Sequence, residues 1–253
     1  MLLRRITKHV KDQNWFAVFI DFIIVVVGVL MAFQITEWSQ LKAEKKSLII
    51  ALERLQEEIQ VNLDSIEATS SRHEKIYTAG FELLRLIRSG DYDEIPLKLI
   101  AKIFVDGFTT DYSTSALTSV LNQQTFKGLQ NSELRPVISS LPAEYLDARE
   151  DEITVIQRLD EHWVPYITQK LPVGELWTVA YEGTEWESEF ASIPKSNEFD
   201  VVSLNDFKEM ASSMAFQNEI VNRIAYENLI MVEQKELRII LTNAMKLIEL
   251  EIK

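Results

Sequence analysis

Apolar and polar positions divide the chain into one continuous apolar run followed by amphipathic segments. The run extends from Trp15 to Phe33, nineteen residues with a single charge at Asp21. A helix of that length rises about 28 Å, close to the hydrocarbon thickness of a bilayer. A lone segment in lipid must be helical, because a helix satisfies its own backbone polar groups. We therefore expect a transmembrane helix over residues 15–36, with Trp15 and Trp38 as interfacial anchors about 35 Å apart.

A cleaved signal peptide is the alternative interpretation of this run. The apolar region of a signal peptide usually has about 7–15 residues and ends at a site of the small-x-small type. This run is longer, and no such site follows Phe33. An uncleaved anchor is the better interpretation.

A periodic apolar stripe follows the run and predicts that the helix continues as a stalk. The chain has neither glycine nor proline between Gly28 and Gly80. Steps of three or four residues, which are typical of one face of an α-helix, separate Leu48, Leu52, Leu55, Ile59, Leu63 and Ile66. The stripe needs a partner, either from this chain or from a second copy. Ser70 and Ser71 are the place where we expect a kink or a break.

Shorter helices are expected over residues 96–166, because proline or a capping residue precedes each apolar segment. Residues 171–205 differ, since they combine glycines, prolines, aromatic rings and many acids. We expect an irregular loop there, in which residues 176–181 can form a short strand that has no obvious partner.

A long helix is expected at the C-terminal end, over residues 206–251, and the stalk is its natural partner. The residues assigned to its core face are Val221, Ile224, Met231, Val232, Ile239, Ile240, Leu247 and Ile248. The fold class is therefore all-α: a single N-terminal transmembrane helix continues into a stalk and an antiparallel helical bundle over residues 37–253.

The Lys and Arg residues on either side of the apolar run favour one orientation in the membrane. Residues 1–14 form a short tail with four Lys and Arg, against three Lys between Lys42 and Lys46. The positive-inside rule then puts the tail in the cytoplasm and the bundle outside it, in the periplasm if the membrane is the bacterial inner membrane. Residues 47–253 hold 19 Lys and Arg and 35 Asp and Glu, a net charge of −16. Such an acidic bundle excludes nucleic acid as a partner.

Two motifs resemble an uncharacterised bacterial family of single-span membrane proteins, described only as a domain of unknown function. The specific motif is the acidic residue, aliphatic run, glycine, glutamine and tryptophan that extend from Asp21 to Trp38. The second block runs from Thr114–Leu117 through Gly128–Leu129 and Ser132–Arg135 towards Tyr145. Thr36-Glu37 departs from the asparagine that the family usually has there. The resemblance implies an architecture and no known activity.

Motifs for catalysis, cofactors and metals are missing from the sequence. The three histidines, His9, His73 and His162, stand in no metal-binding pattern, and we expect Glu161 and His162 on a solvated helix face. The glycines form no phosphate loop, and no cysteine offers a thiol nucleophile. Ser192 and Lys195 match Ser-x-x-Lys by coincidence, because the partner motifs are absent. We therefore expect no enzyme, no cofactor and no metal.

Two groups of residues remain as candidates for recognition. A helix places Asp21, Val25, Gly28 and Ala32 on one face, and the small residues permit close approach of a second span. Packing between spans explains Asp21 better than ion transport does, since one carboxylate makes a poor pathway. The aromatic residues of the loop, Trp177, Tyr181 and Trp186, can form a recognition surface. We favour the alternative that they cover the end of the bundle.

The sequence thus predicts a non-enzymatic, membrane-anchored scaffold or accessory subunit. Its expected partners are membrane lipid and either further copies of itself or another membrane protein. The alternative is an extracytoplasmic helical domain that senses a ligand and signals through a partner protein. A hydrolase that uses the acidic loop is weaker, since no catalytic set is present.

Overall fold

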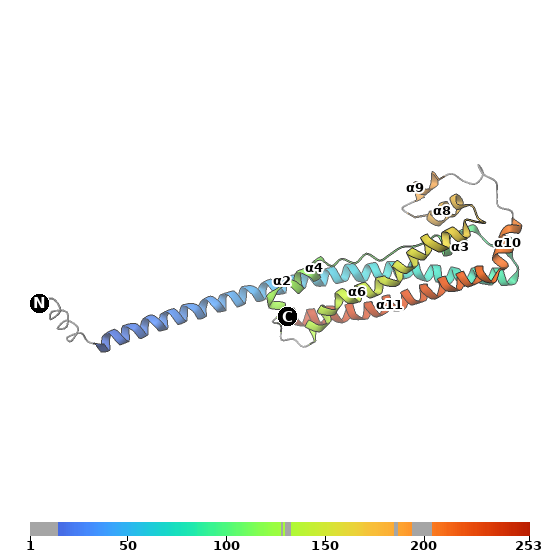
Figure 1. The fold of residues 1–253 in the computed structure, drawn as a ribbon. Helices are drawn as coiled ribbons and strands as arrows, with labels where there is room; N and C mark the ends of the chain where they lie inside the picture. The colour runs from blue at the N-terminus through green and yellow to red at the C-terminus, as the bar shows by residue number, and fades with distance from the viewer. Residues whose placement is uncertain (1–14, 128, 130–132, 185–186, 194–203) are drawn as a thin grey trace. The chain divides into compact units, whose positions relative to one another are not determined.

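The computed structural model describes residues 15–127, 129, 133–184, 187–193 and 204–253, and in this part of the chain the fold is all-α, as predicted. Figure 1 shows the helices in order. They are α2 (Trp15–Ser89), η1 (Tyr92–Glu94), α3 (Leu97–Phe104), α4 (Ser115–Asn122), α5 (Gln124–Lys127), α6 (Leu134–Arg158), η2 (Leu159–Trp163), α7 (Val164–Ile167), α8 (Val173–Tyr181), α9 (Glu187–Ala191), α10 (Leu204–Ser212) and α11 (Met214–Ile252). The chain divides into two compact units, Met1–Ala51 and Leu52–Lys253.

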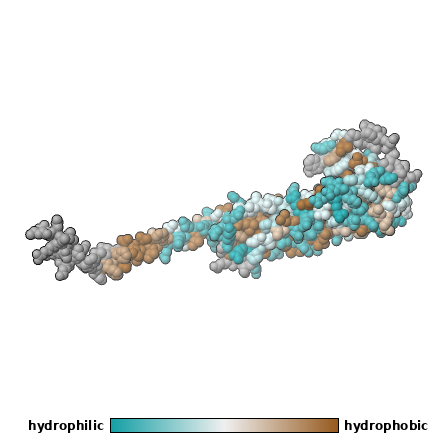
Figure 2. Space-filling model, viewed as in Figure 1, coloured by the Kyte–Doolittle hydropathy of each residue, from teal (hydrophilic) through white to brown (hydrophobic). Residues whose placement is uncertain are grey.

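The first unit consists, in its described part, of the first half of α2. Its large apolar side chains are exposed from Phe19 to Leu41 except at Val26, and Figure 2 shows hydrophobic residues along the part of this helix nearer the N-terminus. From Phe22 onward the helix is long and apolar enough to cross a membrane, by length and composition. The helix that the apolar run predicted is therefore present, and none of its apolar window is buried within the structure.

The second unit begins with the rest of α2, which continues without a break to Ser89. The break predicted as one outcome at Ser70 and Ser71 was wrong. Ser70 donates a hydrogen bond to the side chain of Gln234, so its hydroxyl does not compete with the helical backbone bonds. The helix ends in a Schellman motif: Gly90 has φ 82°, its N–H bonds Ile87 O, and Asp91 N–H bonds Leu86 O.

The long helices α2, α6 and α11 form the body of the second unit and lie side by side in Figure 1. Each of these helices has a row of buried residues in steps of four, three or seven residues, the heptad spacing of left-handed helical packing, and further buried residues flank the rows on α2 and α11. On α2 the row comprises Leu52, Leu55, Ile59, Asn62, Ile66, His73, Ile76, Leu83 and Ile87. On α6 it comprises Leu134, Ile138, Leu141, Tyr145, Ala148, Glu152, Val155 and Leu159, the last in η2. On α11 it comprises Phe216, Ile220, Arg223, Glu227, Ile230, Gln234, Leu237, Leu241, Ala244 and Ile248.

The apolar stripe predicted on α2 is confirmed, since Leu48, Leu52, Leu55, Ile59 and Ile66 are buried, whereas the face predicted on α11 is only partly right. On α11, Ile224, Leu247 and Ile248 are buried as predicted. Val221, Val232 and Ile239 are exposed instead, whereas Arg223 and Glu227 are buried. The predicted face of α11 followed the apolar residues. The core follows a period of 3.5, which keeps one seam along the helix, so the polar residues at seam positions are buried as well.

The irregular loop predicted over residues 171–205 contains two helices in its described part, α8 and α9. The strand predicted over residues 176–181 was wrong, because this segment belongs to α8. A single strand has no partner for its backbone groups, whereas a helix bonds its own. Pro172 precedes the first turn, and Leu176 is buried against the core at 0% exposure. Residues 194–203 lie outside the described part.

The C-terminal helix predicted over residues 206–251 is divided into α10 and α11. Ser213 separates them with an extended backbone, φ −68° and ψ 144°, and its hydroxyl accepts a hydrogen bond from Phe216 N–H at 3.2 Å. This is an N-cap, so a new helix begins at Met214. The separation lets Phe207 and Phe216 pack edge to face in the core, with ring centroids 6.4 Å apart.

Candidate functional site

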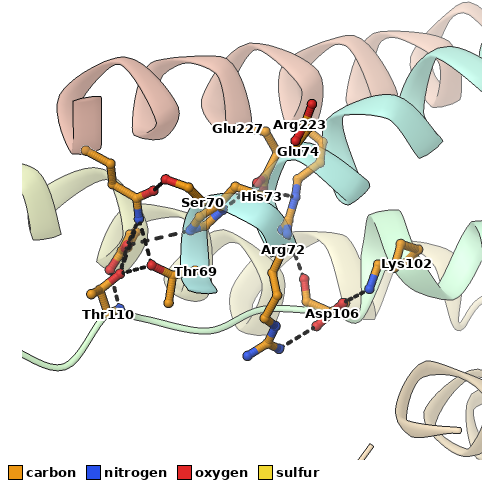
Figure 3. A network of polar contacts seen from close by, with 12 residues as sticks. Thr69, Ser70, Arg72, His73, Glu74, Lys102, Asp106, Thr110, Arg223 and Glu227 are labelled. Atoms are coloured by element: carbon orange, nitrogen blue, oxygen red, sulfur yellow. Dashed lines mark hydrogen bonds and ion pairs between the residues drawn. The ribbon is translucent and has the colours of Figure 1, made fainter. Parts of the chain in front are cut away.

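Polar side chains occupy the heptad seam at the middle of the second unit. His73 of α2, Glu152 of α6 and Glu227 of α11 are at most 2% exposed, as are Arg223 and Gln234 of α11. Buried ionisable groups are rare unless they are paired, because leaving water costs several kcal/mol per ion. Figure 3 shows that those labelled point toward one another between α2 and α11. We call this group, together with Thr110, the seam network.

His73 lies between two carboxylates that come from different helices. Its Nδ1 is 2.6 Å from Glu227 Oε2, and its Nε2 is 3.6 Å from Glu152 Oε1. Burial alone would lower the pKa of His73, but the hydrogen bonds and the charges of both glutamates raise it above the ordinary value. Burial opposes the charged form of Glu152 too, yet His73 and Thr110 lower the pKa of that carboxyl. The arrangement favours an imidazolium between two carboxylates.

Glu152 holds an extended segment, residues 105–114, against the helices. Thr110 donates its N–H and its hydroxyl to the two carboxylate oxygens, each at 2.6 Å. Gln234 donates to the same carboxylate at 2.9 Å and to the hydroxyls of Thr69 and Thr110 at 3.2 Å. Since these partners come from α2, α6, α11 and the segment, the network specifies how the four parts align.

Arg223 is the second buried cation, and it connects the network to Asp106. Its Nε lies 2.7 Å from Glu227 Oε1, and its Nη2 donates to the backbone oxygen of Asp106 at 2.7 Å. Burial lowers the pKa of Arg223, against the opposing charges of Glu227 and Asp106. The indole ring of Trp163 lies 5.3 Å from the guanidinium carbon. Arg223 thus holds Asp106 in place, and Asp106 also lines a pocket at the surface.

That surface pocket has a volume of about 430 Å³ and lies in the second unit. It is lined by Arg72, Lys102, Asp106, Gly107, Phe108, Ala180, Tyr181 and Thr184. Asp106 accepts from Lys102 Nζ at 2.6 Å and from Arg72 Nη2 at 3.4 Å (Figure 3). Gly107 has no room for a side chain, because a Cβ there would lie 2.2 Å from a methyl group of the buried Leu159.

A second polar contact lies further along the bundle, where Glu58 of α2 receives the start of α4. The carboxylate accepts the N–H groups of Ala116 and Leu117 at 2.8 and 2.9 Å and the hydroxyls of Ser113 and Ser115. A carboxylate at this position compensates the first N–H groups of the helix and its dipole. This contact is structural: it fixes α4 on α2.

Of the aromatic residues predicted as a recognition loop, Tyr181 lines the pocket. Trp177 and Tyr181 stack with Phe190 in one group, with ring centroids 4.0 to 5.9 Å apart. Tyr181 lines that pocket together with Arg72 and Lys102, two cations that no sequence pattern placed beside it. Trp186 lies outside the described residues.

The residues predicted in the apolar run do not meet the seam network. Val25 and Trp38 are exposed at 63% and 66%, Ala32 is exposed, and a Cβ on Gly28 would meet nothing within 4 Å. The side chains of Trp15 and Asp21 lie outside the described part. The contact face of Asp21, Val25, Gly28 and Ala32 therefore stays a prediction.

Sequence reasoning missed the seam network. His73 was considered only as a metal ligand; within the described ranges, no group of three His, Cys, Asp or Glu is arranged to hold a metal ion. A heptad pattern in the sequence can find this network. On α2, His73 follows the buried Ile66 by seven residues, and on α11, Gln234 follows Glu227 by seven residues.

Comparisons with models of protein families, with curated proteins and with solved structures give no match.

Proposed function

We propose that the protein is a non-enzymatic scaffold or accessory subunit, anchored in the bacterial inner membrane through residues 15–36. One observation carries the proposal. The large apolar side chains of α2 between Phe19 and Leu41 are exposed, except that of Val26, and the same helix supplies part of the heptad seam of the bundle. Exposed apolar surface on that scale marks a membrane or a protein interface. The hydrophilic surface of the bundle in Figure 2 fits a domain that stays in water.

The proposed orientation puts the bundle in the periplasm. Its support is the Lys and Arg count around the run, four before it against three after it. Fusing a reporter that is active only in the cytosol after Lys253 is expected to give no signal. The same reporter fused before Met1 is the matched control and is expected to be active. The reverse pattern would contradict the orientation.

Self-association through the apolar run is the expected form of the scaffold. A lone span gains nothing from a small-residue face unless a second helix packs on it. Gly28→Leu is therefore expected to shift the protein from oligomer to monomer in mild detergent, as measured by native mass spectrometry. Asp21→Asn is expected to have a smaller effect, because a neutral amide keeps the hydrogen bond.

The control for this experiment adds bulk to the opposite side of the helix. Val26 lies about 160° around the helix from Gly28, so Val26→Phe is expected to leave the oligomer intact. A wild-type protein that is monomeric in several gentle detergents would contradict self-association. The accessory-subunit form of the proposal would then remain, with a different protein on the same face.

The second candidate function is a ligand-sensing domain that signals through a partner protein. The observation that favours it is the junction of pocket and core on α2, where Arg72 lines the pocket and the next residue, His73, is buried in the seam network. A ligand that changes the charge balance at Asp106 would act on Arg223 through the backbone of Asp106. The network joins α2, α6 and α11, so it is the element through which such a change would spread.

A further inference from the structure

The pocket beside Asp106 has the features of a small-molecule site. Its walls come from four separate places: α2, the end of α3, residues 106–108 and the end of α8. Its volume of about 430 Å³ lies in the range of sites that enclose small ligands. Gly107 and the backbone bond from Arg223 hold its floor against η2 and α11.

The charge in the pocket is opposite to that of the rest of the domain. Arg72 and Lys102 contribute two positive charges and Asp106 one negative charge, which leaves a net charge of +1 in a bundle of net charge −16 over residues 47–253. The side chains of Arg72 and Lys102 are 46% and 28% exposed, so both can reach a ligand. A net charge of +1 matches a monoanion and leaves a dianion half compensated.

The geometry of Arg72 selects a planar anion. Its guanidinium carbon lies over the ring of Phe108, 3.6 Å from the centroid, and the group contacts Asp106 through Nη2 alone at 3.4 Å. A guanidinium fork offers five N–H donors and binds a carboxylate through two parallel hydrogen bonds. Arg72 therefore keeps donors for a second carboxylate on the open side of the pocket.

The aromatic walls select the rest of the ligand. Phe108 stands on one side, and Tyr181 on another is kept in position by its stack with Phe190. Both rings are half-buried. Arg72 lies over Phe108 and the ring of His73 is 4.4 Å from it, so Phe108 offers a ligand its edge, and Tyr181 offers its exposed surface. Flat apolar groups pack well against such rings, in offset or edge-on contact.

We propose that this pocket binds a small monocarboxylate that carries an aromatic ring. The carboxylate pairs with Arg72 and Lys102, and the ring packs against Tyr181 and Phe108. This inference names the ligand of the proposed ligand-sensing function. It rests on that function only for what binding would do, and not for binding itself. Binding is measured at equilibrium, so its failure is distinct from a failure of anchoring, self-association or signalling.

The test is a calorimetric titration of the full chain, purified in detergent micelles, with benzoate, 4-hydroxybenzoate and phenylacetate. Saturable binding by at least one of the three is expected. Benzamide keeps the ring without the charge, and acetate keeps the charge without the ring. Each is expected to bind at least about tenfold more weakly than the best of the three carboxylates. Failure of all three carboxylates to bind, or equal binding of benzamide, would overturn the proposal.

Substitutions of pocket residues test whether the ligand binds at this site. Arg72→Gln and Tyr181→Leu are each expected to weaken the best carboxylate by about tenfold or more, and Arg72→Lys by less, because it keeps the charge without the fork. Lys98→Gln is the matched control: Lys98 is on the same helix as Lys102, pairs with Glu182 at 3.0 Å and does not line the pocket. Wild-type affinity in both Arg72→Gln and Tyr181→Leu would overturn the assignment of the site.

Discussion

Replacing Glu227 by alanine is expected to lower the free energy of unfolding of the bundle by about 3–5 kcal/mol. Glu227 is the only carboxylate that contacts both buried cations, His73 and Arg223, among the described residues. Its removal leaves two positive charges that are at most 2% exposed and have lost their closest counter-charge. The change is measured by denaturant unfolding of the full chain in micelles, followed by circular dichroism.

Two further variants separate charge from position on α11. Glu236→Ala removes an exposed carboxylate from the same helix and is expected to change the free energy of unfolding by less than about 0.5 kcal/mol. Glu227→Gln keeps the side-chain volume and a hydrogen-bonding oxygen but not the charge, so we expect an intermediate loss. If Glu227→Ala is no more damaging than Glu236→Ala, the seam network contributes nothing to stability.

A fall in stability as the pH rises above about 6.5 is the second large effect that we expect. The pKa of His73 is raised from the ordinary value of 6.5, because the hydrogen bonds and charges of Glu152 and Glu227 outweigh burial. The folded protein therefore binds this proton more tightly than the unfolded chain does. Its contribution to stability is complete below pH 6.5 and is lost as the pH rises through the folded pKa, by up to about 1.4 kcal/mol per pH unit.

The measurement compares melting temperatures of wild type and His73→Gln across this pH range. The charged groups that face His73 are Glu152 from α6 and Glu227 with Arg223 from α11. His73→Gln is expected to flatten the profile above pH 6.5, although it lowers stability at acid pH. Parallel profiles for the two proteins would contradict the prediction.

Glu233 contributes a second pH dependence that must be separated from that of His73. Burial and the neighbouring Asp151 raise its pKa from 4.5 to about 7. Its ionisation costs stability as the pH rises from 4.5 towards 7, and the cost stays constant above that. The comparison is therefore repeated in a Glu233→Gln background, where the slope that remains above pH 6.5 belongs to His73.

Glu152 shapes the acid side of the same profile. Burial acts against its ionisation, but the contacts with His73 and Thr110 lower its pKa below the ordinary value of 4.5. Its contribution is present above pH 4.5 and is lost as the pH falls through the lower, folded value. We therefore expect the bundle to be most stable at mildly acid pH, between the titrations of Glu152 and His73.

Local pattern was enough to predict the helices, and the physical reason is their length. An apolar run of nineteen residues, and the fifty-one positions without glycine or proline between Gly28 and Gly80, leave few structures other than a long helix. Gly90 and Pro96 mark the end of that helix and the start of the next, since both act through their own backbone. The strand expected over residues 176–181 failed because short apolar segments suit either structure, and burial of Leu176 decided the outcome.

What the sequence by itself determined is thus the all-α class and an apolar helix fit for a membrane, because both depend on neighbours within a few turns. Which faces meet, and which charges they bury, was decided by the tertiary structure. His73, Glu152 and Glu227 are polar in any local pattern, and they enter the core only because three helices share one heptad seam. The pocket depends on contacts of the same long range, since Arg72, Lys102 and Tyr181 come together only when α2, α3 and α8 pack.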